Sequence, residues 1–355
     1  MDVVRVNVSK PYDVLIGRGI LDSVGERLRE VSEPCRCAVI TDDIVSELYK
    51  ERVVQSLEAS GFSAVSFVFQ NGEQSKTLAT FGKALEFLAE QKLSRTDLVV
   101  ALGGGVVGDL AGFVSSVYLR GVRFIQIPTT LLAAVDSSVG GKTAVDLAAG
   151  KNLAGAFYQP ELVLCDPDTL STLPAEFIAD GMAEVIKYGM IYDKELFSFV
   201  AGGANSDMYE RIIRRCVEIK AHFVENDERD NGIRQLLNFG HTAGHAIEKC
   251  SNMTITHGNA VAIGMAIVAK ACAAMGIAEQ SLPSELISCL RNNNLPVECE
   301  FTAQELAAAA LSDKKRRGGS ISVVVVRAVG DSFLKPIRCE ETADFFKQGM
   351  GEESV

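Results

Sequence analysis

The chain has 355 residues, and its 35 Lys and Arg residues against 46 Asp and Glu residues give a formal net charge of −11. This length suggests about two domains, and 47% hydrophobic with 23% charged residues is the composition of a globular protein rather than a disordered one. The acidic excess argues against nucleic acid as a partner, because affinity for a phosphate backbone depends mainly on Lys and Arg.

The beginning of the chain and its cysteines indicate the compartment. The first eight residues, MDVVRVNV, alternate apolar and polar side chains, which predicts a strand and lacks the layout of a signal peptide. Nine cysteines are scattered without a C-x-x-C pair, so we expect reduced thiols in a cytoplasmic protein. The longest apolar stretches, such as 260–269, are much shorter than the roughly 20 residues that span a bilayer, so we expect no membrane partner.

The first half of the chain alternates strand-like with helix-like segments. Predicted strands cover 3–8, 12–16, 37–41, 64–69, 98–102, 124–127 and 162–165, and predicted helices cover 44–60, 78–91 and 110–118. This alternation predicts βαβ units around a mainly parallel sheet, an architecture typical of nucleotide-binding domains.

The second half is mainly helical. Helices are predicted at 175–188, 209–225, 233–250, 260–275, 284–292 and 303–311, with one late strand at 321–327. We therefore predict two domains, an α/β nucleotide-binding domain at 1–172 and a mainly helical domain at 173–355. A binding pocket is expected between the two halves, near the carboxyl ends of the parallel strands.

A glycine-rich loop follows the predicted strand 98–102. Gly103, Gly105 and Gly108 match G-x-G-x-x-G between a strand and a helix, where the backbone can approach a pyrophosphate. A tight turn without a ligand is an equal alternative for this pattern alone. The loop follows a later strand than in a standard Rossmann domain. Asp42 and Glu73, which end or follow earlier strands, are therefore the candidate acids for a ribose.

A second Gly-rich stretch begins at residue 136. Residues 136–143 read DSSVGGKT, which ends like a phosphate-binding P-loop, but Asp136 stands where that loop needs its first glycine. An ATPase is therefore not favoured. Lys142, Lys151 and Asn152 are embedded among small residues and are candidates to hold an anionic substrate, although lysines in loops are usually solvated.

Three of the four histidines, His241, His245 and His257, fall within seventeen residues. His241 and His245 are four residues apart on a predicted helix, so their imidazoles share a face on which His257 can converge. This cluster favours a metal or acid–base site over buried structural histidines. The chain contains no H-E-x-x-H pattern, so the sequence does not indicate a zincin protease. Glu184 is the candidate carboxylate ligand, although an i, i+3 ion pair with Lys187 is the simpler explanation of that segment.

These motifs closely resemble those of the 3-dehydroquinate synthase family, within the sugar-phosphate cyclases. The resemblance covers nearly the whole chain, through residues 71–76, 103–109, 127–138, 150–153, 180–188, 237–248 and 313–315. Asn71 departs from the aspartate of many members. The resemblance implies an α/β N-terminal nucleotide-binding domain with a mainly parallel sheet, a mainly α-helical metal- and substrate-binding C-terminal domain, and a homodimer.

The resemblance also implies NAD and one divalent metal ion, zinc or cobalt, as cofactors. The metal ligands correspond to Glu184, His241 and His257, whereas His245 corresponds to an acid–base residue that contacts the substrate. The implied NAD contacts are Asp42, Glu73, Lys76, Gly104, Gly105, Val106, Asp109, Thr129, Thr130, Asp136, Lys142, Lys151, Thr169, Leu170, Ser171 and Thr172. The implied substrate contacts are Asp136, Lys142, Asn152, Lys187, Lys220, Arg234, Asn238, His245, one of Lys314 and Lys315, and Arg120, which reaches the neighbouring subunit.

The implied substrate is a small anionic sugar phosphate, 3-deoxy-D-arabino-heptulosonate 7-phosphate. Transient oxidation by NAD, phosphate elimination, re-reduction and aldol cyclisation give 3-dehydroquinate, on the shikimate pathway to chorismate and aromatic amino acids. The implied enzyme is a carbon–oxygen lyase acting on phosphates. Another sugar-phosphate cyclase and a polyol dehydrogenase of the glycerol dehydrogenase type are the alternatives. An inactive NAD-binding or scaffold protein is disfavoured, because it has no reason to retain Glu184 and the three histidines.

Overall fold

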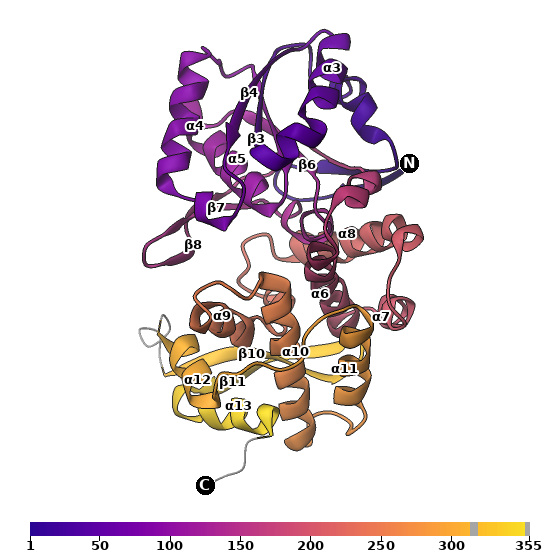
Figure 1. The fold of residues 1–355 in the computed structure, drawn as a ribbon, viewed down its shortest axis with the longest axis vertical. Coiled ribbons are helices and arrows are strands. Elements are labelled where there is room, and N and C mark those ends of the chain that lie inside the picture. The colour runs from indigo at the N-terminus through magenta and orange to yellow at the C-terminus, as the bar shows by residue number, and fades with distance from the viewer. Residues whose placement is uncertain (313–318, 352–355) are drawn as a thin grey trace. The chain divides into compact units, whose positions relative to one another are not determined.

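The computed structural model describes residues 1–312 and 319–351 (Figure 1). The chain forms two compact units. Unit 1 consists of Met1–Leu173 and Tyr209–Arg229, and unit 2 of Pro174–Met208 and Asp230–Val355. The first crossing between the units lies at 173/174, one residue after the predicted boundary at 172/173, and the sequence gives no sign that the chain returns to unit 1.

Unit 1 is built on a seven-stranded sheet with the order β1-β2-β9-β6-β5-β3-β4. In this sheet β1 and β2 pair antiparallel, and the other described neighbours pair parallel, which confirms the predicted α/β class. The strands are β1 (Asp2–Val6), β2 (Tyr12–Ile16), β3 (Arg36–Asp42), β4 (Ser63–Phe69), β5 (Leu98–Gly103), β6 (Arg123–Pro128) and β9 (Leu162–Cys165).

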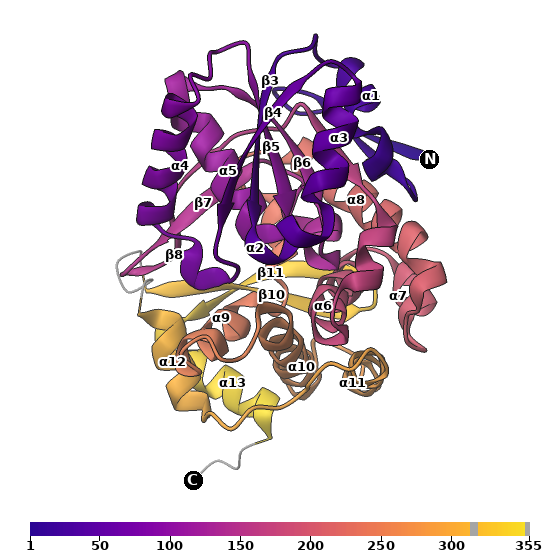
Figure 2. The same ribbon diagram turned by 45° about the horizontal axis from the view of Figure 1, so that its top comes forward.

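Helices cover both faces of this sheet, as Figure 2 shows for α1 and α3 on one side and α4 and α5 on the other. Val39 of β3 packs in one apolar layer and its neighbour Ile40 in the other. Successive strand residues point to opposite faces, so a sheet covered on both faces needs strands that are apolar at nearly every position. The helices are α1 (Val24–Arg29), α3 (Glu51–Ala59), α4 (Leu78–Glu90) and α5 (Gly105–Val117).

Three details of unit 1 differ from the prediction. The expected helix 44–60 consists of α2 (Asp43–Val45), a π-helical turn η2 (Ser46–Lys50) and α3, and α5 begins five residues before the predicted 110. A stretch expected as loop forms an antiparallel hairpin, β7 (Lys142–Leu147) and β8 (Gly150–Phe157). Apolar and polar residues alternate only weakly in this hairpin, and the flanking glycines conceal the strand pattern.

Helix α8 (Tyr209–Asn226) belongs to unit 1, although the sequence predicts it in the second domain. The backbone and side-chain amides of Asn7 donate to Glu225 Oε1 at 2.7 and 2.9 Å. The hydroxyl of Ser9 donates to Glu228 Oε1 at 2.7 Å. These contacts attach α8 to the segment between β1 and β2, more than 200 residues away in sequence.

Unit 2 is mainly helical, as predicted, with one two-stranded hairpin. The predicted helix 233–250 is interrupted at Gly240, whose φ of 79° lies in the left-handed region. His241 therefore becomes the first residue of a new helix. The elements are α6 (Ala175–Ile191), α7 (Lys194–Val200), η8 (Ile233–Asn238), α9 (His241–Cys250), α10 (His257–Ala274), α11 (Leu282–Asn292), α12 (Ala303–Leu311), β10 (Ser320–Ala328), β11 (Asp331–Arg338) and α13 (Thr342–Met350).

Helix α10 is largely buried within unit 2. Within 1–312 and 319–351 it is the one helix long and apolar enough to cross a membrane by length and composition. Because 78% of its length is buried inside the protein, the apolar surface is accounted for by packing.

All nine cysteines lie in the described ranges and are free thiols there. Cys37, Cys165, Cys216, Cys272 and Cys289 are buried. Burial raises the pKa of Cys165 and raises that of Cys289 to about 12, so these thiols serve as apolar packing residues.

Candidate active site

The glycine loop of unit 1 leads directly into α5. Gly104 is the N-cap of this helix and Gly105 its first residue. A Cβ atom on Gly104 would lie 3.0 Å from Thr130 Cγ2, and one on Gly105 would lie 3.1 Å from Ser137 Oγ, so the backbone passes close to its neighbours. A glycine N-cap offers no side chain to the first N–H groups of α5. These groups and the helix dipole therefore suit a phosphate-bearing ligand.

Lys76 is the centre of a polar network in unit 1. Its Nζ lies 2.6 Å from Asp109 Oδ2, donates to Asn152 Oδ1 at 2.6 Å, and lies 4.0 Å from Glu73 Oε1. Lys151 Nζ lies 3.8 Å from the same Glu73 oxygen. Burial opposes the charge of Lys76, but the carboxylates outweigh it and raise the pKa of this amine. Five predicted site residues are thus brought together.

This network includes Asp146, which the sequence analysis missed. Asp146 Oδ1 accepts the N–H of Asn152 at 2.7 Å, and the N–H of Asp146 donates to the carbonyl of Lys76 at 2.8 Å. Asn152 has a φ of 55°, in the left-handed region that Asn tolerates better than most residues. The hairpin therefore fixes Asn152 next to Lys76. The alternation of apolar and polar residues over 142–147 was the sequence pattern that could have predicted this hairpin, and with it Asp146.

Lys220 and Asp136 form a second polar pair in unit 1. Lys220 Nζ donates to the carbonyl oxygen of Asp136 at 2.5 Å and to its carboxylate. Both were expected to contact substrate, but Lys220 was expected in the second domain. That placement is wrong, because α8 carries Lys220 back to unit 1.

Other predicted NAD contacts follow the carboxyl ends of parallel strands. Asp42 ends β3 and accepts the N–H of Val45 at 2.9 Å, while burial raises the pKa of its carboxyl. Thr129 and Thr130 follow β6. Because these strand ends share one edge of the sheet with the glycine loop, the predicted contacts lie on the same side of unit 1.

The predicted contacts Thr169, Leu170, Ser171 and Thr172 lie in η6 (Pro167–Thr172), after β9. The hydroxyl of Tyr49 donates to the carbonyl of Thr169 at 3.0 Å and lies 2.5 Å from Thr172 Oγ1. The sequence analysis missed Tyr49, which is buried on η2 as part of an apolar layer. Tyr49 therefore attaches this turn to the helix that follows β3.

Two predicted substrate contacts of unit 1 are exposed. Lys142 begins β7, and Arg120 has a φ of 69°, beside Leu119 with 51°. Lys314 and Lys315 lie outside the described residues. The roles of these four residues stay predictions.

Three candidate metal ligands converge in unit 2. Glu184 Oε1 lies 3.4 Å from His257 Nε2 and 3.6 Å from His241 Nε2, and the three ligand atoms lie within 4.8 Å of one another. Two ligand atoms of a tetrahedral ion with bonds of about 2.0–2.1 Å lie about 3.3 Å apart. The arrangement therefore fits one divalent ion, with Glu184 completely buried.

Backbone geometry brings these ligands together. His241 and His257 are the first residues of α9 and α10. His241 Nδ1 lies 3.2 Å from the carbonyl oxygen of Phe239, which leaves Nε2 for Glu184. The two helices approach so closely that a Cβ atom on Gly264 would lie 2.1 Å from the carbonyl oxygen of Gly240.

Gly264→Ala is therefore expected to separate α9 from α10 and to lower the free energy of unfolding by about 1–3 kcal/mol. Urea denaturation measures this change. Gly82→Ala on α4 is the matched control, because its Cβ meets nothing within 4 Å. That variant should be neutral or slightly stabilising. Equal stability of the two variants would contradict the close approach.

The surrounding groups affect the two imidazoles differently. Burial lowers the pKa of His241 to about 3, despite the nearby Glu184 carboxylate. Burial also opposes protonation of His257, but Glu184 and Glu248 outweigh it and raise its pKa to about 10. The site thus combines a neutral imidazole with a strong local attraction for positive charge.

Glu184 also contacts Lys187, one turn along α6. Lys187 Nζ donates to Glu184 Oε2, whereas Oε1 of the same carboxylate faces the two histidines. Both side chains are almost completely buried. The ion pair and the ligand role, which the sequence left as alternatives, are therefore geometrically compatible.

His245 lies beside this trio but differs from it in exposure. Its ring centroid is 5.4 Å from that of His241 and 6.1 Å from that of His257, and its side chain is exposed. A second possible ligand group combines His245, Glu248 and His257. An exposed imidazole next to a largely buried ligand set suits proton transfer to a bound molecule.

Arg234 and Asn238 lie in η8 of unit 2. Arg234 is 2% exposed, and Asn238 is exposed. Lys220, which like Arg234 was expected to contact the substrate, belongs to unit 1. The joint role of Lys220 and Arg234 stays a prediction.

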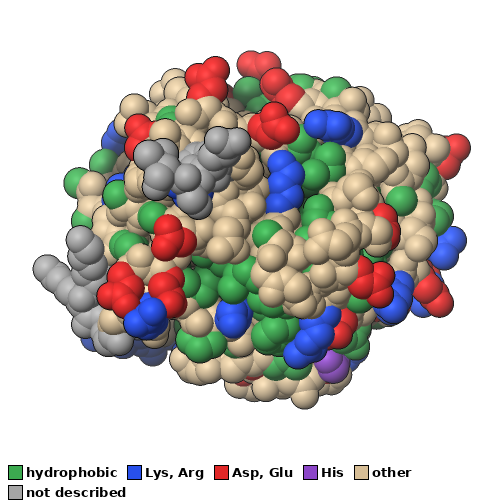
Figure 3. All heavy atoms as spheres, turned by 90° about the horizontal axis from the view of Figure 1, so that it is seen from below, with side chains coloured by type: hydrophobic (Ala, Val, Ile, Leu, Met, Phe, Trp, Pro, Cys, Tyr) green, Lys and Arg blue, Asp and Glu red, His purple; other side chains and the backbone are tan. Residues whose placement is uncertain are grey.

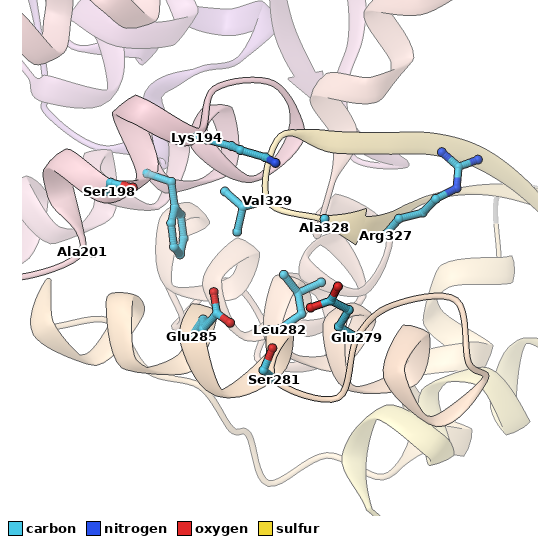
Figure 4. A pocket seen from close by; sticks show the side chains of 11 residues that line it. Lys194, Ser198, Ala201, Glu279, Ser281, Leu282, Glu285, Arg327, Ala328 and Val329 are labelled. Atoms are coloured by element: carbon cyan, nitrogen blue, oxygen red, sulfur yellow. The ribbon is translucent and has the colours of Figure 1, made fainter.

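A pocket of about 510 Å³ in unit 2 involves none of the predicted site residues. In Figure 4, Lys194 lies on one side and Glu279 and Glu285 lie on the other. On the face of the molecule in Figure 3, acidic and basic side chains are likewise interspersed. The pocket is lined by Lys194, Phe197, Ser198, Ala201, Glu279, Ser281, Leu282, Glu285, Arg327, Ala328 and Val329.

Two family models match consecutive parts of the chain. Residues 66–180 match "3-dehydroquinate synthase N-terminal", and residues 181–316 match "3-dehydroquinate synthase C-terminal". The 3-dehydroquinate synthase of Streptococcus gordonii is 46% identical over 345 residues, which cover 95% of this chain and 97% of that protein. That of Streptococcus mutans is 44% identical over 354 residues, which cover 97% of this chain and 100% of that protein.

Solved structures of related enzymes share the fold over almost the full length. A 2-deoxy-scyllo-inosose synthase complexed with carbaglucose-6-phosphate, NAD+ and Co2+ has a TM-score of 0.88 and 26% identity, covering 98% of this chain and 100% of that one. A 2-epi-5-epi-valiolone synthase from Streptomyces hygroscopicus subsp. jinggangensis 5008, with NAD+ and Zn2+ bound, has a TM-score of 0.87 and 26% identity, covering 98% of each chain.

Proposed function

The chain belongs to the 3-dehydroquinate synthase family, and we propose that it converts 3-deoxy-D-arabino-heptulosonate 7-phosphate to 3-dehydroquinate and phosphate. The observation that carries this proposal is the convergence of Glu184, His241 and His257 in a chain that also has a glycine loop before α5. The enzyme is a carbon–oxygen lyase of the shikimate pathway to chorismate.

When bound, NAD accepts and returns a hydride, and one zinc or cobalt ion acidifies substrate hydroxyls. In unit 1 the first N–H groups of α5, at Gly104 to Val106, bind the pyrophosphate of NAD, and Asp42 and Glu73 accept hydrogen bonds from its riboses. The remaining residues proposed to bind NAD are Lys76, Asp109, Thr129, Thr130, Asp136, Lys142, Lys151, Thr169, Leu170, Ser171 and Thr172.

Unit 2 holds the metal ion through Glu184, His241 and His257. Lys187 balances the second carboxylate oxygen of Glu184 and orients it toward the histidines. His245, exposed beside this trio, takes the proton of the substrate hydroxyl that is oxidised. The exposure of His245 supports this role, because a proton acceptor must reach the bound substrate.

The anionic ends of the substrate require cations. We assign the phosphate to Lys142, Asn152, Asn238, Arg120 and one of Lys314 and Lys315, with Arg120 supplied by the second subunit of a homodimer. Lys220, oriented by Asp136, and Arg234 bind the carboxylate. These local cations make an anionic substrate compatible with a net charge of −11 in a cytoplasmic enzyme.

One assay separates this reaction from its alternatives. The heptulosonate phosphate is supplied with catalytic NAD and a divalent metal, and phosphate release and dehydroquinate formation are followed. A polyol dehydrogenase would consume NAD stoichiometrically and oxidise glycerol, and a different sugar-phosphate cyclase would release no phosphate from this substrate. Either result would contradict the proposal.

Arg234→Ala is expected to raise the KM for the heptulosonate phosphate at least about tenfold, because a charge-assisted contact contributes about 1.5–3 kcal/mol. The affinity for NAD should stay within about twofold. Steady-state kinetics and fluorescence titration with NADH measure the two quantities. Equal losses of both affinities would contradict the assignment of Arg234 to the substrate carboxylate.

A further inference from the structure

The N-terminus of α10, where His257 lies, is capped by a residue of another helix. Thr256, the N-cap of α10, makes no side-chain cap hydrogen bond. Asp180 of α6 fills this role, because its Oδ1 accepts the N–H of Gly258 at 2.6 Å and that of Asn259 at 3.3 Å. A carboxylate at this position also interacts favourably with the helix dipole.

Helix α6, which carries Asp180, also carries Glu184 one turn later. Asp180 thus connects the backbone next to one candidate ligand, His257, with the helix that supplies another. The contact is close, since a Cβ atom on Gly258 would lie 2.0 Å from the carbonyl oxygen of Asp180. Glycine is therefore the residue that fits at this contact, and the separation of α6 from the N-terminus of α10 is fixed.

The ring of His257 has its own partner. Glu248 is almost completely buried in α9, and its Oε2 lies 3.6 Å from His257 Nδ1. The opposite ring nitrogen, Nε2, faces Glu184. A carboxylate next to the outer nitrogen of a ligating histidine selects the tautomer and raises ligand basicity. His241 uses the backbone carbonyl of Phe239 for the same purpose.

We propose that Asp180 and Glu248 are the positioning residues of the metal site. Asp180 fixes where His257 lies relative to Glu184, and Glu248 fixes how its ring is turned. This inference rests on the proposed ligand set, Glu184, His241 and His257, and it assigns roles to two residues outside that set.

Cobalt is the probe for the test, because it reports affinity and geometry together. Apo-protein is titrated with Co2+ while its visible absorption is recorded. Glu248→Ala should bind Co2+ about 10–100-fold more weakly and shift the absorption band at saturation, because the ring of His257 is no longer held. Glu248→Gln retains an acceptor oxygen and should recover part of both properties. It also serves if the alanine variant does not fold.

Asp180→Ala should weaken Co2+ binding about tenfold or more, and Asp180→Asn should restore part of this loss. Thr302→Ala is the matched control, because Thr302 caps α12 in the same unit by accepting the N–H of Glu305 at 3.3 Å. The two alanine variants should lower the melting temperature similarly, while Thr302→Ala leaves Co2+ affinity unchanged.

Three outcomes have separate meanings. A folded Glu248→Ala variant that binds Co2+ within about twofold of the parent, with the same absorption band, would overturn the positioning role. Binding of two Co2+ ions per chain, with the second lost in Glu248→Gln, would overturn it in favour of the ligand group His245, Glu248 and His257. Unchanged binding in Glu184→Ala would overturn the ligand set of the proposed function itself.

Discussion

Replacing Glu184 with glutamine is expected to lower turnover by about 10³-fold or more and to destabilise the fold by about 3–5 kcal/mol. The first effect follows because the ion loses its anionic ligand, and Lewis-acid assistance contributes several kcal/mol to a transition state. The second follows because the variant leaves the buried ammonium of Lys187 without the carboxylate it contacts. Phosphate release and urea denaturation measure the two effects.

The double variant Glu184→Gln/Lys187→Met separates the two effects. Removal of both charges should recover most of the lost stability, because a buried pair replaced by neutral groups of similar volume is often well tolerated. It should not recover turnover, since the ligand is still missing. Lys187→Met alone should be destabilised, which completes the double-mutant cycle.

Glu30→Gln provides the matched control for burial. Arg27 and Glu30 form an exposed i, i+3 pair at 2.9 Å, with the same spacing as Glu184 and Lys187. Exposed pairs contribute about 0–1 kcal/mol, so this variant should unfold almost like the parent protein. Equal destabilisation by Glu30→Gln and Glu184→Gln would contradict the importance of burial at the site.

The strands of unit 1 are predictable because successive strand residues point to opposite faces of the sheet, and both faces bury apolar side chains. Val39 and Ile40 face opposite layers, and apolar runs of this kind identified the interior strands of the large sheet. The edge strand β1 was identified instead by its alternation of apolar and polar residues. The hairpin β7–β8 has no such run, because β8 is exposed or half-exposed throughout, the buried part of β7 is limited to residues 143–145, and glycines flank the strands. The return of α8 to unit 1 depends on long-range contacts such as Asn7 with Glu225, which leave no local pattern.

The candidate site, like the fold, has features that the sequence predicts and features that it does not. Spacing identified the residues of the histidine cluster, because a shared helix face is a local property. It could not rank His241 above His245 as a ligand, since i and i+4 positions are equivalent on an uninterrupted helix. The interruption at Gly240 removes this equivalence, because it makes His241 the first residue of α9. The family resemblance, rather than the spacing, supplied the assignment of roles, which stays a prediction.

The second large effect distinguishes these two histidines. His241→Asn is expected to weaken Co2+ binding at least about 100-fold and to abolish turnover, because Nε2 of His241 is one of three converging ligand atoms. His245→Asn is expected to bind Co2+ within a few-fold of the parent and yet lower kcat by about 10²–10⁴-fold, the usual contribution of general acid–base catalysis.

Co2+ titration and phosphate release at saturating metal measure both quantities on the same samples. His222→Asn is the matched control, because it removes the fourth histidine, which lies on α8 of unit 1 and whose backbone carbonyl accepts a hydrogen bond from Asn226 Nδ2 at 2.7 Å. Turnover and Co2+ affinity should both be unchanged in that variant.

The contrast between the two variants decides the roles of the histidines because each role predicts a different pair of losses. A ligand loses affinity and turnover together, whereas an acid–base residue loses turnover at constant affinity. If His245→Asn lost Co2+ as His241→Asn does, the ion would have to reach the exposed side of the cluster, toward His245 and Glu248. Glu184 would then serve mainly as the buried partner of Lys187, and the proposed proton acceptor would have to be a different group.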